Sequence, residues 1–144
     1  MNSRSAFQRT PVRKGITFGT FDLLHVGHVS ILERARALCD YLMVGVSTDE
    51  LTFAKKSVEP VYSLPERMRI VRSLRAVDFV FVEESLERKA EYIREFDASL
   101  LVMGDDWEGR FDHLRDLCDV VYLPRTRDVS TTLVRAGVVA RSAR

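Results

Sequence analysis

Two histidines three positions apart, His25 and His28, lie between an apolar run at residues 16–18 and a helical pattern that starts at Val29. The apolar run predicts a strand, so the intervening loop leads from a strand end to a helix N-terminus. Backbone N–H groups and the positive end of the helix dipole favour an anion there, and Gly27 leaves room for close approach. The imidazoles can donate to charge that builds on phosphate, so the loop predicts a site for nucleotidyl transfer from a triphosphate.

Other uses of the same loop are less consistent with the rest of the sequence. The two histidines could bind zinc, but the remaining candidate ligands, His113 and the two cysteines, fall in predicted helices and not in a ligand cluster. The chain has no G-x-x-x-x-G-K-[ST] segment, and the loop lacks the third glycine of a dinucleotide fingerprint. We therefore assign no metal site to protein side chains.

A second candidate anion site precedes the last helical pattern of the chain. Ser130 and Thr131 place hydroxyl groups and backbone N–H groups at a predicted helix start, and Arg125 stands shortly before them. This arrangement favours phosphate. An ordinary serine N-cap explains Ser130 equally well, so both interpretations stay open.

Three further polar features are ambiguous when each is read alone. The pair Asp105–Asp106 follows a predicted strand and could bind a metal ion, a hydroxyl group or a base amine, whereas the adjacent Trp107 is more typical of packing. Arg67 lies in the first turn of a predicted helix and is typical of a solvated arginine. The lysines at 55–56 lie in a predicted loop, and the same interpretation applies to them.

The bulk composition indicates one globular domain. The chain has 144 residues, of which 46% are hydrophobic and 30% charged, and its formal net charge is +1. That balance gives no reason to expect nucleic acid or a membrane surface as partner, and no apolar run approaches the ~20 residues of a membrane helix. Residues 1–13 are basic and lack an apolar centre, so we expect a tail and not a secretory signal. Cys39 and Cys118 are expected to be reduced thiols of a cytoplasmic protein.

Short apolar runs alternate with amphipathic stretches along the chain. The predicted strands are residues 16–18, 41–46, 79–82, 100–104 and 120–123, and the predicted helices are 29–39, 63–74, 86–96, 111–118 and 130–139. Residues 47–62 are expected to be mainly loop, and Ser63 with Glu66 predicts a capping box.

This alternation predicts an α/β fold. We expect a single-domain, doubly wound, Rossmann-like sheet of five parallel strands with helices on both faces, built from residues 14–139 and followed by a short tail at 140–144. Ligands of such sheets bind beyond the C-terminal ends of the strands. The polar segments named above follow predicted strands, so the fold would gather them at one edge.

Residues 19–28 resemble the H-x-G-H signature of the nucleotidyltransferase superfamily. With the segments at 47–50, 103–109, 122–126 and 130–132, the likeness covers roughly residues 15–138 and points to the small cytidylyltransferases, most closely the glycerol-3-phosphate cytidylyltransferase family. The resemblance implies transfer of CMP from CTP to sn-glycerol 3-phosphate, giving CDP-glycerol, a precursor of teichoic acid or capsular polymers, and pyrophosphate. It also implies Mg²⁺ as cofactor and a homodimer.

The same resemblance assigns roles to individual residues. His25, His28, Arg67 and a lysine would act on the phosphates during transfer. The residues that would bind the substrates are Gly19, Thr20, Phe21, Asp22, Gly27, Asp105, Trp107, Arg125, Thr126, Ser130 and Thr131.

The lysine loop departs from the family pattern, in which two lysines are separated by one residue. Lys55 and Lys56 are adjacent here, so the loop aligns in more than one way. We choose Lys55 as the phosphate lysine and keep Lys56 as the alternative. The altered spacing also leaves open another acceptor, such as a different alcohol phosphate, a phosphonate or a sugar phosphate. A nucleotide-binding module without catalysis is the remaining alternative, although both histidines and the arginine are present.

Overall fold

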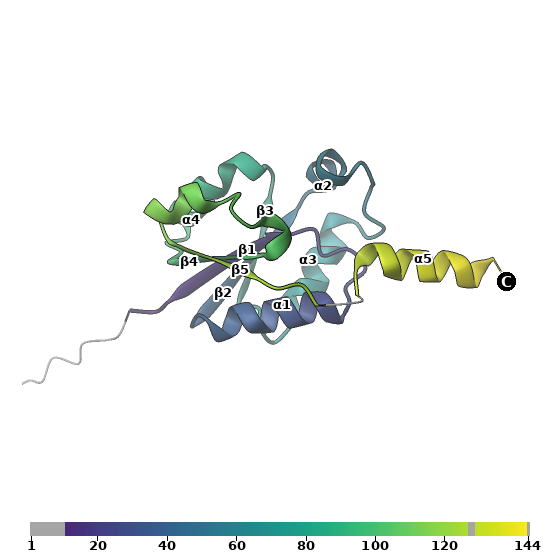
Figure 1. Cartoon of the computed structure of the whole chain (residues 1–144), viewed down its shortest axis with the longest axis horizontal. Helices are drawn as coiled ribbons and strands as arrows, with labels where there is room; N and C mark the ends of the chain where they lie inside the picture. The colour runs from purple at the N-terminus through teal and green to yellow at the C-terminus, as the bar shows by residue number, and fades with distance from the viewer. Residues whose placement is uncertain (1–10, 127–128, 144) are drawn as a thin grey trace, which may run out of the picture.

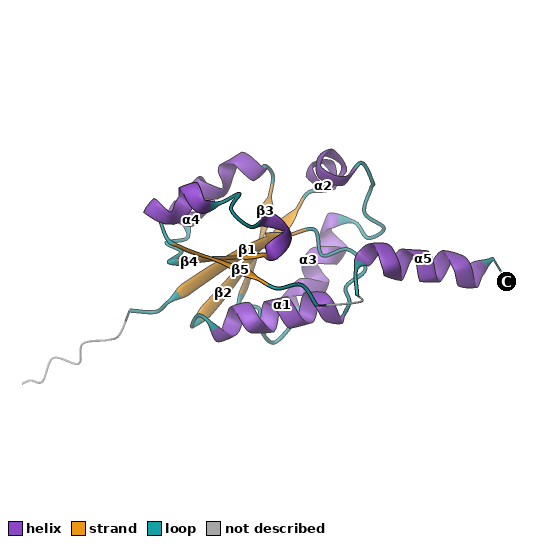
Figure 2. Ribbon diagram, in the orientation of Figure 1, coloured by secondary structure: helices purple, strands orange, loops and turns teal. Residues whose placement is uncertain are grey.

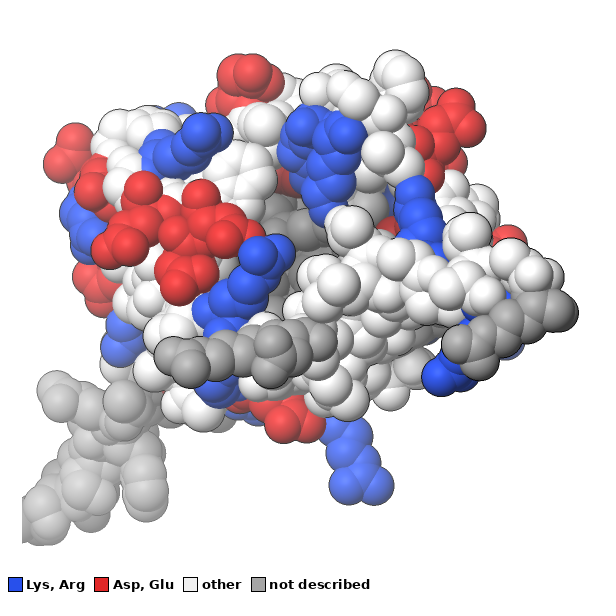
Figure 3. Space-filling model, turned by 45° about the vertical axis from the view of Figure 1, so that its right-hand side comes forward, with Lys and Arg blue, Asp and Glu red and all other residues white. Residues whose placement is uncertain are grey.

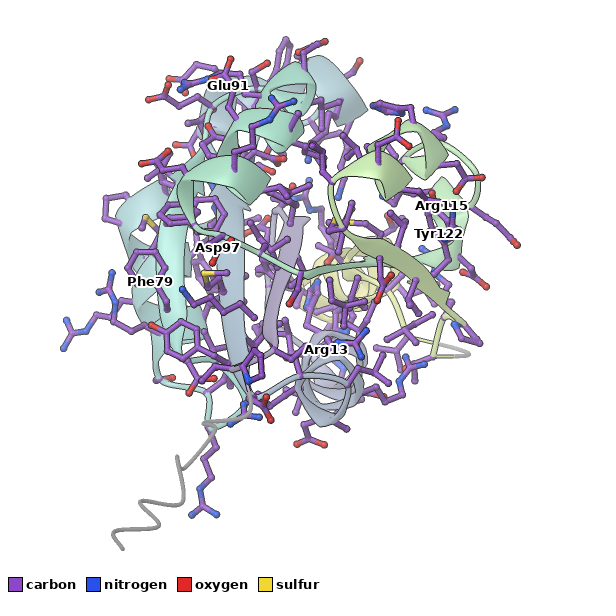
Figure 4. The ribbon with its side chains drawn as sticks, turned by 90° about the vertical axis from the view of Figure 1, so that its left-hand side faces the viewer. Arg13, Phe79, Glu91, Asp97, Arg115 and Tyr122 are labelled. Carbon is purple, nitrogen blue, oxygen red and sulfur yellow. The ribbon has the colours of Figure 1, made fainter. Side chains whose placement is uncertain are left out.

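The computed structural model describes residues 11–126 and 129–143 (Figure 1). Five strands form one parallel sheet in the order β3-β2-β1-β4-β5, which confirms the predicted architecture. The strands are β1 (Lys14–Gly19), β2 (Tyr41–Ser47), β3 (Phe79–Glu83), β4 (Leu100–Gly104) and β5 (Asp119–Leu123). Figure 4 shows the two edges of the sheet, with Phe79 of β3 at one side and Tyr122 of β5 at the other.

Helices cover both faces of the sheet (Figure 2). The α-helices are α1 (Val26–Ala37), α2 (Asp49–Lys56), α3 (Leu64–Arg72), α4 (Lys89–Glu95) and α5 (Thr131–Ser142). The short 3₁₀ helices are η1 (Leu86–Arg88), η2 (Asp105–Trp107) and η3 (Asp112–Asp116). Because the central strands are buried on both faces, they read as continuous apolar runs in the sequence.

Two apolar clusters, one on each face, hold the layers together. On one face, Leu32 of α1 and Val71 of α3 pack with Val44 of β2. On the other face, Ile93 of α4 packs with Leu101 of β4. Cys39 and Cys118 are buried free thiols within these clusters. Among the described residues, no helix has both the length and the hydropathy needed to cross a membrane.

The expectation that residues 47–62 are mainly loop is wrong, because α2 occupies half of this segment. Thr48 caps the helix, since its Oγ1 accepts a hydrogen bond from the Leu51 N–H at 3.0 Å. Asp49 and Glu50 place negative charge in the first turn, where the helix dipole favours it. The helix is only eight residues long, which is too short to produce a clear apolar period.

Four other element predictions also need correction. The capping box expected at Ser63 is absent, because the Ser63 side chain makes no cap hydrogen bond. The helix expected at 86–96 divides into η1 and α4, and the one at 111–118 is the 3₁₀ helix η3. Helix α5 continues to Ser142, so most of the tail expected at 140–144 is helical.

The direction in which the chain winds outward reverses between β1 and β4. From β1 the chain moves through β2 to β3 on one side, and it then returns to β4 and β5 on the other side. At the C-terminal ends of β1 and β4, the loops that follow these two strands therefore run in opposite directions. Ligands of open parallel sheets bind at this place.

Candidate nucleotide-binding site

A cavity of about 230 Å³ lies at the C-terminal ends of β1 and β4. The start of α1 forms one wall, and the start of α5 forms another. Figure 3 shows this side of the molecule, with acidic side chains gathered on the left and lysine and arginine side chains nearer the centre. The lining residues are His25, Gly27, His28, Ile31, Arg34, Lys56, Gly104, Asp105, Asp106, Arg125, Thr126, Val129, Ser130, Thr131 and Thr132.

His25 and His28 form the N-terminal cap of α1. The Nδ1 atom of His25 accepts a hydrogen bond from the Gly27 N–H at 3.0 Å, and Nδ1 of His28 accepts from the His25 N–H at 3.1 Å. The two rings stack with their centroids 3.9 Å apart. Because each Nδ1 is an acceptor, the proton of each neutral ring is on Nε2. The helix therefore begins at Val26, and its cap presents two Nε2–H donors.

Burial keeps His28 in the neutral form. It lowers the pKa of His28 to about 4, and the nearby His25 and Lys56 act in the same direction, against the opposing effect of Asp22. The pKa of His25 is also lowered, mainly by burial and then by Arg125. The lowered pKa of both histidines favours the neutral ring, in which Nε2–H is a hydrogen-bond donor.

Gly27 is required by the histidine cap itself. A Cβ atom at this position would lie 2.8 Å from Cε1 and 2.9 Å from Nδ1 of His25. Gly19 has a similar constraint, since a Cβ there would lie 2.9 Å from the Phe21 ring. Both glycines were predicted to bind substrate; a side chain at either position would meet His25 or Phe21, and Gly27 also lines the cavity.

The two predicted anion sites meet in the cavity although they are about a hundred residues apart in the sequence. Ser130 caps α5, because its Oγ accepts a hydrogen bond from the Leu133 N–H at 3.1 Å. The ordinary N-cap interpretation is therefore confirmed, and the capped helix start also lines the cavity beside His28. Arg125 and Thr126 line the same cavity, and Arg125 lies 3.3 Å from a carboxylate oxygen of Asp106.

Of the two adjacent lysines, Lys56 faces the cavity and Lys55 points away from it. Lys56 lines this cavity and also a second one of about 470 Å³ next to it. Lys55 instead donates to Ser47 Oγ at 2.9 Å, and Ser47 donates to the buried Glu83 at 2.8 Å. Burial lowers the pKa of Lys55 to about 8. The position favours Lys56, the alternative of the two lysines, for contact with phosphate.

Arg67 is fully buried and lines neither cavity, so the interpretation of a solvated arginine is wrong. Its guanidinium pairs with Asp49 and donates to the backbone carbonyls of Thr20, Ser47 and Tyr62 at 2.7–3.0 Å. The group joins the loop after β1 to the start of α2. The direct phosphate contact predicted for Arg67 has no counterpart in this geometry.

The residues Thr20, Phe21 and Asp22 also point into the protein. Thr20 Oγ1 lies 3.1 Å from Oγ1 of Thr52, and Phe21 packs against His28 with ring centroids 5.6 Å apart. The buried Asp22 carboxylate accepts hydrogen bonds from the Val61 and Tyr62 N–H groups and from Arg135 Nη2. These residues, predicted to bind substrate, do not line the cavity beside the histidines, although Thr20 and Asp22 line the second cavity.

Of the predicted site residues that follow β4, the aspartates lie at the cavity and the tryptophan does not. Asp105 and Asp106 line the cavity, whereas Trp107 packs on Phe111 with ring centroids 5.5 Å apart. Two lining residues of α1, Ile31 and Arg34, were not predicted from the sequence. They follow His28 by three and six positions, so the helical period could have indicated them.

The carboxylates at the cavity fit Mg²⁺ bound together with a nucleotide. Magnesium sites in phosphate chemistry commonly take one or two carboxylates and complete the shell with water and substrate phosphates. Within residues 11–126 and 129–143, no cluster of three His, Cys, Asp or Glu side chains could hold a metal ion. Asp105 and Asp106 are the carboxylates that line the cavity, and they would contribute to an ion bound there with the nucleotide.

Fold and site together define an α/β protein with a nucleotide cavity formed by an H-x-G-H loop and a helix start. The chain belongs to the cytidylyltransferase-like family, whose family model matches residues 16–137. A glycerol-3-phosphate cytidylyltransferase of Bacillus subtilis is 48% identical over 127 residues, which cover 88% of this chain and 98% of that protein. A glycerol-3-phosphate cytidylyltransferase of Staphylococcus aureus is 41% identical over 133 residues, covering 92% of this chain and 100% of its own.

Solved structures show the same fold at low sequence identity. A lipopolysaccharide core biosynthesis protein from Thermoplasma volcanium matches with a TM-score of 0.68 at 20% identity, covering 81% of this chain and 99% of that one. A pantoate-beta-alanine ligase from Francisella tularensis matches with a TM-score of 0.58 at 16% identity, covering 88% of this chain and 69% of that one. At these identities the likeness is one of fold.

Proposed function

We propose that this protein transfers CMP from CTP to sn-glycerol 3-phosphate and releases CDP-glycerol and pyrophosphate. The observation that carries the proposal is the cavity in which His25 and His28 face the start of α5 and Lys56. Support for the acceptor comes from the two relatives named for this activity, which match this chain over almost their whole length.

The geometry suits an in-line displacement. A phosphate oxygen of the acceptor attacks the α-phosphorus of CTP, the bond from that phosphorus to the bridging oxygen breaks, and pyrophosphate leaves with the electron pair. The Nε2–H groups of His25 and His28 donate to the oxygens on which charge builds. Because the acceptor phosphate is itself the nucleophile, the protein needs no nucleophilic side chain. Positioning and fixed donors supply the rate.

The rest of the cavity suits the remaining parts of the nucleotide. The N–H groups at the start of α5, with Thr131 and Arg125, offer an anion site for phosphates. Lys56 adds positive charge beside the histidines. We also propose Mg²⁺ as cofactor, which would neutralise phosphate charge when bound at Asp105 and Asp106.

A panel of acceptors distinguishes the proposed reaction from its alternatives. Pyrophosphate release from CTP is measured with glycerol 3-phosphate, other alcohol phosphates, a phosphonate and a sugar phosphate, with ATP as the second nucleotide. The proposal expects the highest kcat/KM for CTP with glycerol 3-phosphate. Turnover with another acceptor, and none with glycerol 3-phosphate, would contradict the proposed acceptor but support the proposed nucleotidyl transfer.

We further propose that the protein acts as a cytoplasmic homodimer, as the family resemblance implies. Light scattering of the purified full chain gives the mass directly, and the proposal expects twice the mass of the 16.5 kDa chain. A monomer mass across the micromolar range would contradict it.

A further inference from the structure

Among the described residues, the side-chain hydrogen bonds that link helix α5 to other elements converge on Asp22. Thr131 Oγ1 donates to the Asp22 carbonyl at 3.0 Å, and Arg135 Nη2 lies 3.1 Å from the Asp22 carboxylate. Thr131 and Arg135 are four positions apart, so they lie on one face of the helix.

Apolar packing contributes little to the position of this helix. None of its residues is buried, and Leu133, Val138 and Val139 are each more than half exposed. Figure 1 shows α5 projecting away from the sheet. The second cavity, about 470 Å³, lies between the start of α5 and the end of α2.

Asp22 also forms hydrogen bonds with the segment that follows α2. Its carboxylate oxygens accept hydrogen bonds from the Val61 and Tyr62 N–H groups at 2.8 and 2.9 Å. This segment continues from Lys56, the last residue of α2. Asp22 therefore connects the segment that follows the lysine-bearing helix α2 with helix α5.

The backbone around Asp22 shows that these contacts maintain a strained conformation. Phe21 and Leu23, on either side of it, have φ values of +54° and +46°, in the left-handed region. Such residues persist only where surrounding contacts fix them. The hydrogen bonds of the carboxylate provide that constraint.

We propose that Arg135 is a positioning residue for nucleotide binding, which acts by anchoring α5 to Asp22. The anchor sets Ser130, Thr131 and Thr132 against His28 and Lys56, so that the phosphates meet both walls of the cavity together. Arg135 itself does not line the nucleotide cavity. This inference rests on the proposed function, because it takes CTP to be the ligand whose phosphates bind at the start of α5.

The test compares Arg135→Met with Arg141→Met, a matched arginine in the last turn of the same helix, which is exposed. Titration calorimetry with CTP is expected to show a Kd raised roughly three- to tenfold by Arg135→Met and unchanged by Arg141→Met, as for loss of about 1 kcal/mol. At saturating CTP, kcat stays within about twofold of the parent, while KM for CTP rises with Kd. Arg135→Lys restores part of the affinity. A Kd for Arg135→Met equal to that of the parent overturns the proposal.

Two further measurements separate anchoring from other roles. If Arg135 acts through Asp22, Arg135→Met adds no further loss of CTP affinity in an Asp22→Asn background, and additive losses overturn that route. Hydrogen exchange of α5 amides in the absence of nucleotide is expected to be faster in Arg135→Met than in Arg141→Met.

The exchange measurement also distinguishes this inference from the proposed function. Faster exchange in Arg135→Met, together with no CTP binding by the parent protein, would overturn the function and leave the anchor supported. Equal exchange in the two variants, with normal CTP binding by the parent, overturns the anchor and leaves the function intact.

Discussion

At the scale of single residues, His25 and His28 each serve two purposes with one ring. The Nδ1 atoms cap α1, and this directs the Nε2–H groups into the cavity. A cap that depends on both rings fixes their orientation before substrate arrives, so no free energy is spent on ordering them during the reaction. The lowered pKa values of both histidines have the same origin, because burial of the stacked pair disfavours the imidazolium form.

Substitution of His28 separates the helix cap from the hydrogen-bond donor. His28→Ala removes both, and we expect kcat to fall by ~10²–10³-fold with a loss of roughly 0.5–1 kcal/mol in unfolding free energy. Glutamine is a favoured residue at the third position of a capping box, so His28→Gln should lose kcat with little loss of stability. Steady-state kinetics and urea unfolding provide the two measurements. His113→Ala is the exposed control. A kcat near the parent value in both His28 variants would contradict the assigned role.

The low pKa of His28 predicts a pH dependence of stability. The unfolded chain takes up a proton at this residue near pH 6.5, whereas the folded protein does so only near pH 4. The unfolded state therefore binds more protons in this window, and the free energy of unfolding should decrease as the pH falls from about 6.5 to about 4. His28→Gln should reduce this slope in urea titrations at a series of pH values. An identical slope in the parent and the variant would contradict the neutral, buried form.

Residue types and spacing, together with the family resemblance, predicted part of the site. His25, His28, Arg125, Thr126, Ser130 and Thr131 all line the cavity, because each sits at a strand end or a helix start that the sequence pattern indicated. Arg67 and Asp22 were expected at the ligand, but both are buried and bind protein groups. A charged residue buried by tertiary contacts has the same local sequence as an exposed one, so the pattern could not distinguish the two.

At the scale of elements, helix α2 determines which of the two adjacent lysines lies at the cavity. Residues 47–62 show no clear helical period, so the adjacent lysines could not be distinguished within a predicted loop. On a helix, neighbouring side chains diverge by about 100°, so Lys56 faces the cavity while Lys55 turns to Ser47. Buried Arg67 fixes the start of this helix through Asp49.

Separate substitution of the two lysines tests this assignment. Lys56→Met should raise KM for CTP by roughly tenfold, because it removes a cation beside the histidines at a site where charge-assisted contacts contribute about 1.5 kcal/mol or more. Lys55→Met on the same helix is the matched control and should have a smaller effect on KM. A larger increase in KM for Lys55→Met than for Lys56→Met would instead assign the phosphate contact to Lys55.

Substitution of Arg67 should lower the free energy of unfolding. Arg67→Met leaves three backbone carbonyl groups, two of them buried, and Asp49 without their donor, so we expect a loss of about 3 kcal/mol in the free energy of unfolding. Arg69→Met, an exposed position on the same helix α3, should change it by less than about 0.5 kcal/mol. Urea unfolding measures both. Equal stability of the two variants, with activity lost only in Arg67→Met, would instead support direct contact between Arg67 and the substrate.

At the scale of the whole molecule, the reversal of winding between β1 and β4 assembles the site. The alternation of apolar runs with amphipathic stretches sufficed to predict the five parallel strands, since a sheet covered on both faces leaves that signature. The order β3-β2-β1-β4-β5 is determined by packing of helices on the two faces, which the local pattern does not specify. The position of α5 depends on Asp22 and Arg135, a contact between residues 113 positions apart.

The transfer of label from CTP tests the central claim most directly. CTP labelled with ³²P at the α-phosphate or at the γ-phosphate is incubated with the full chain, Mg²⁺ and glycerol 3-phosphate, and His28→Ala serves as the control. We predict that the α-label appears in CDP-glycerol and the γ-label in pyrophosphate, and that both products are nearly absent with His28→Ala. A γ-label on the acceptor, or CTP bound with no transfer to any acceptor, would contradict the account.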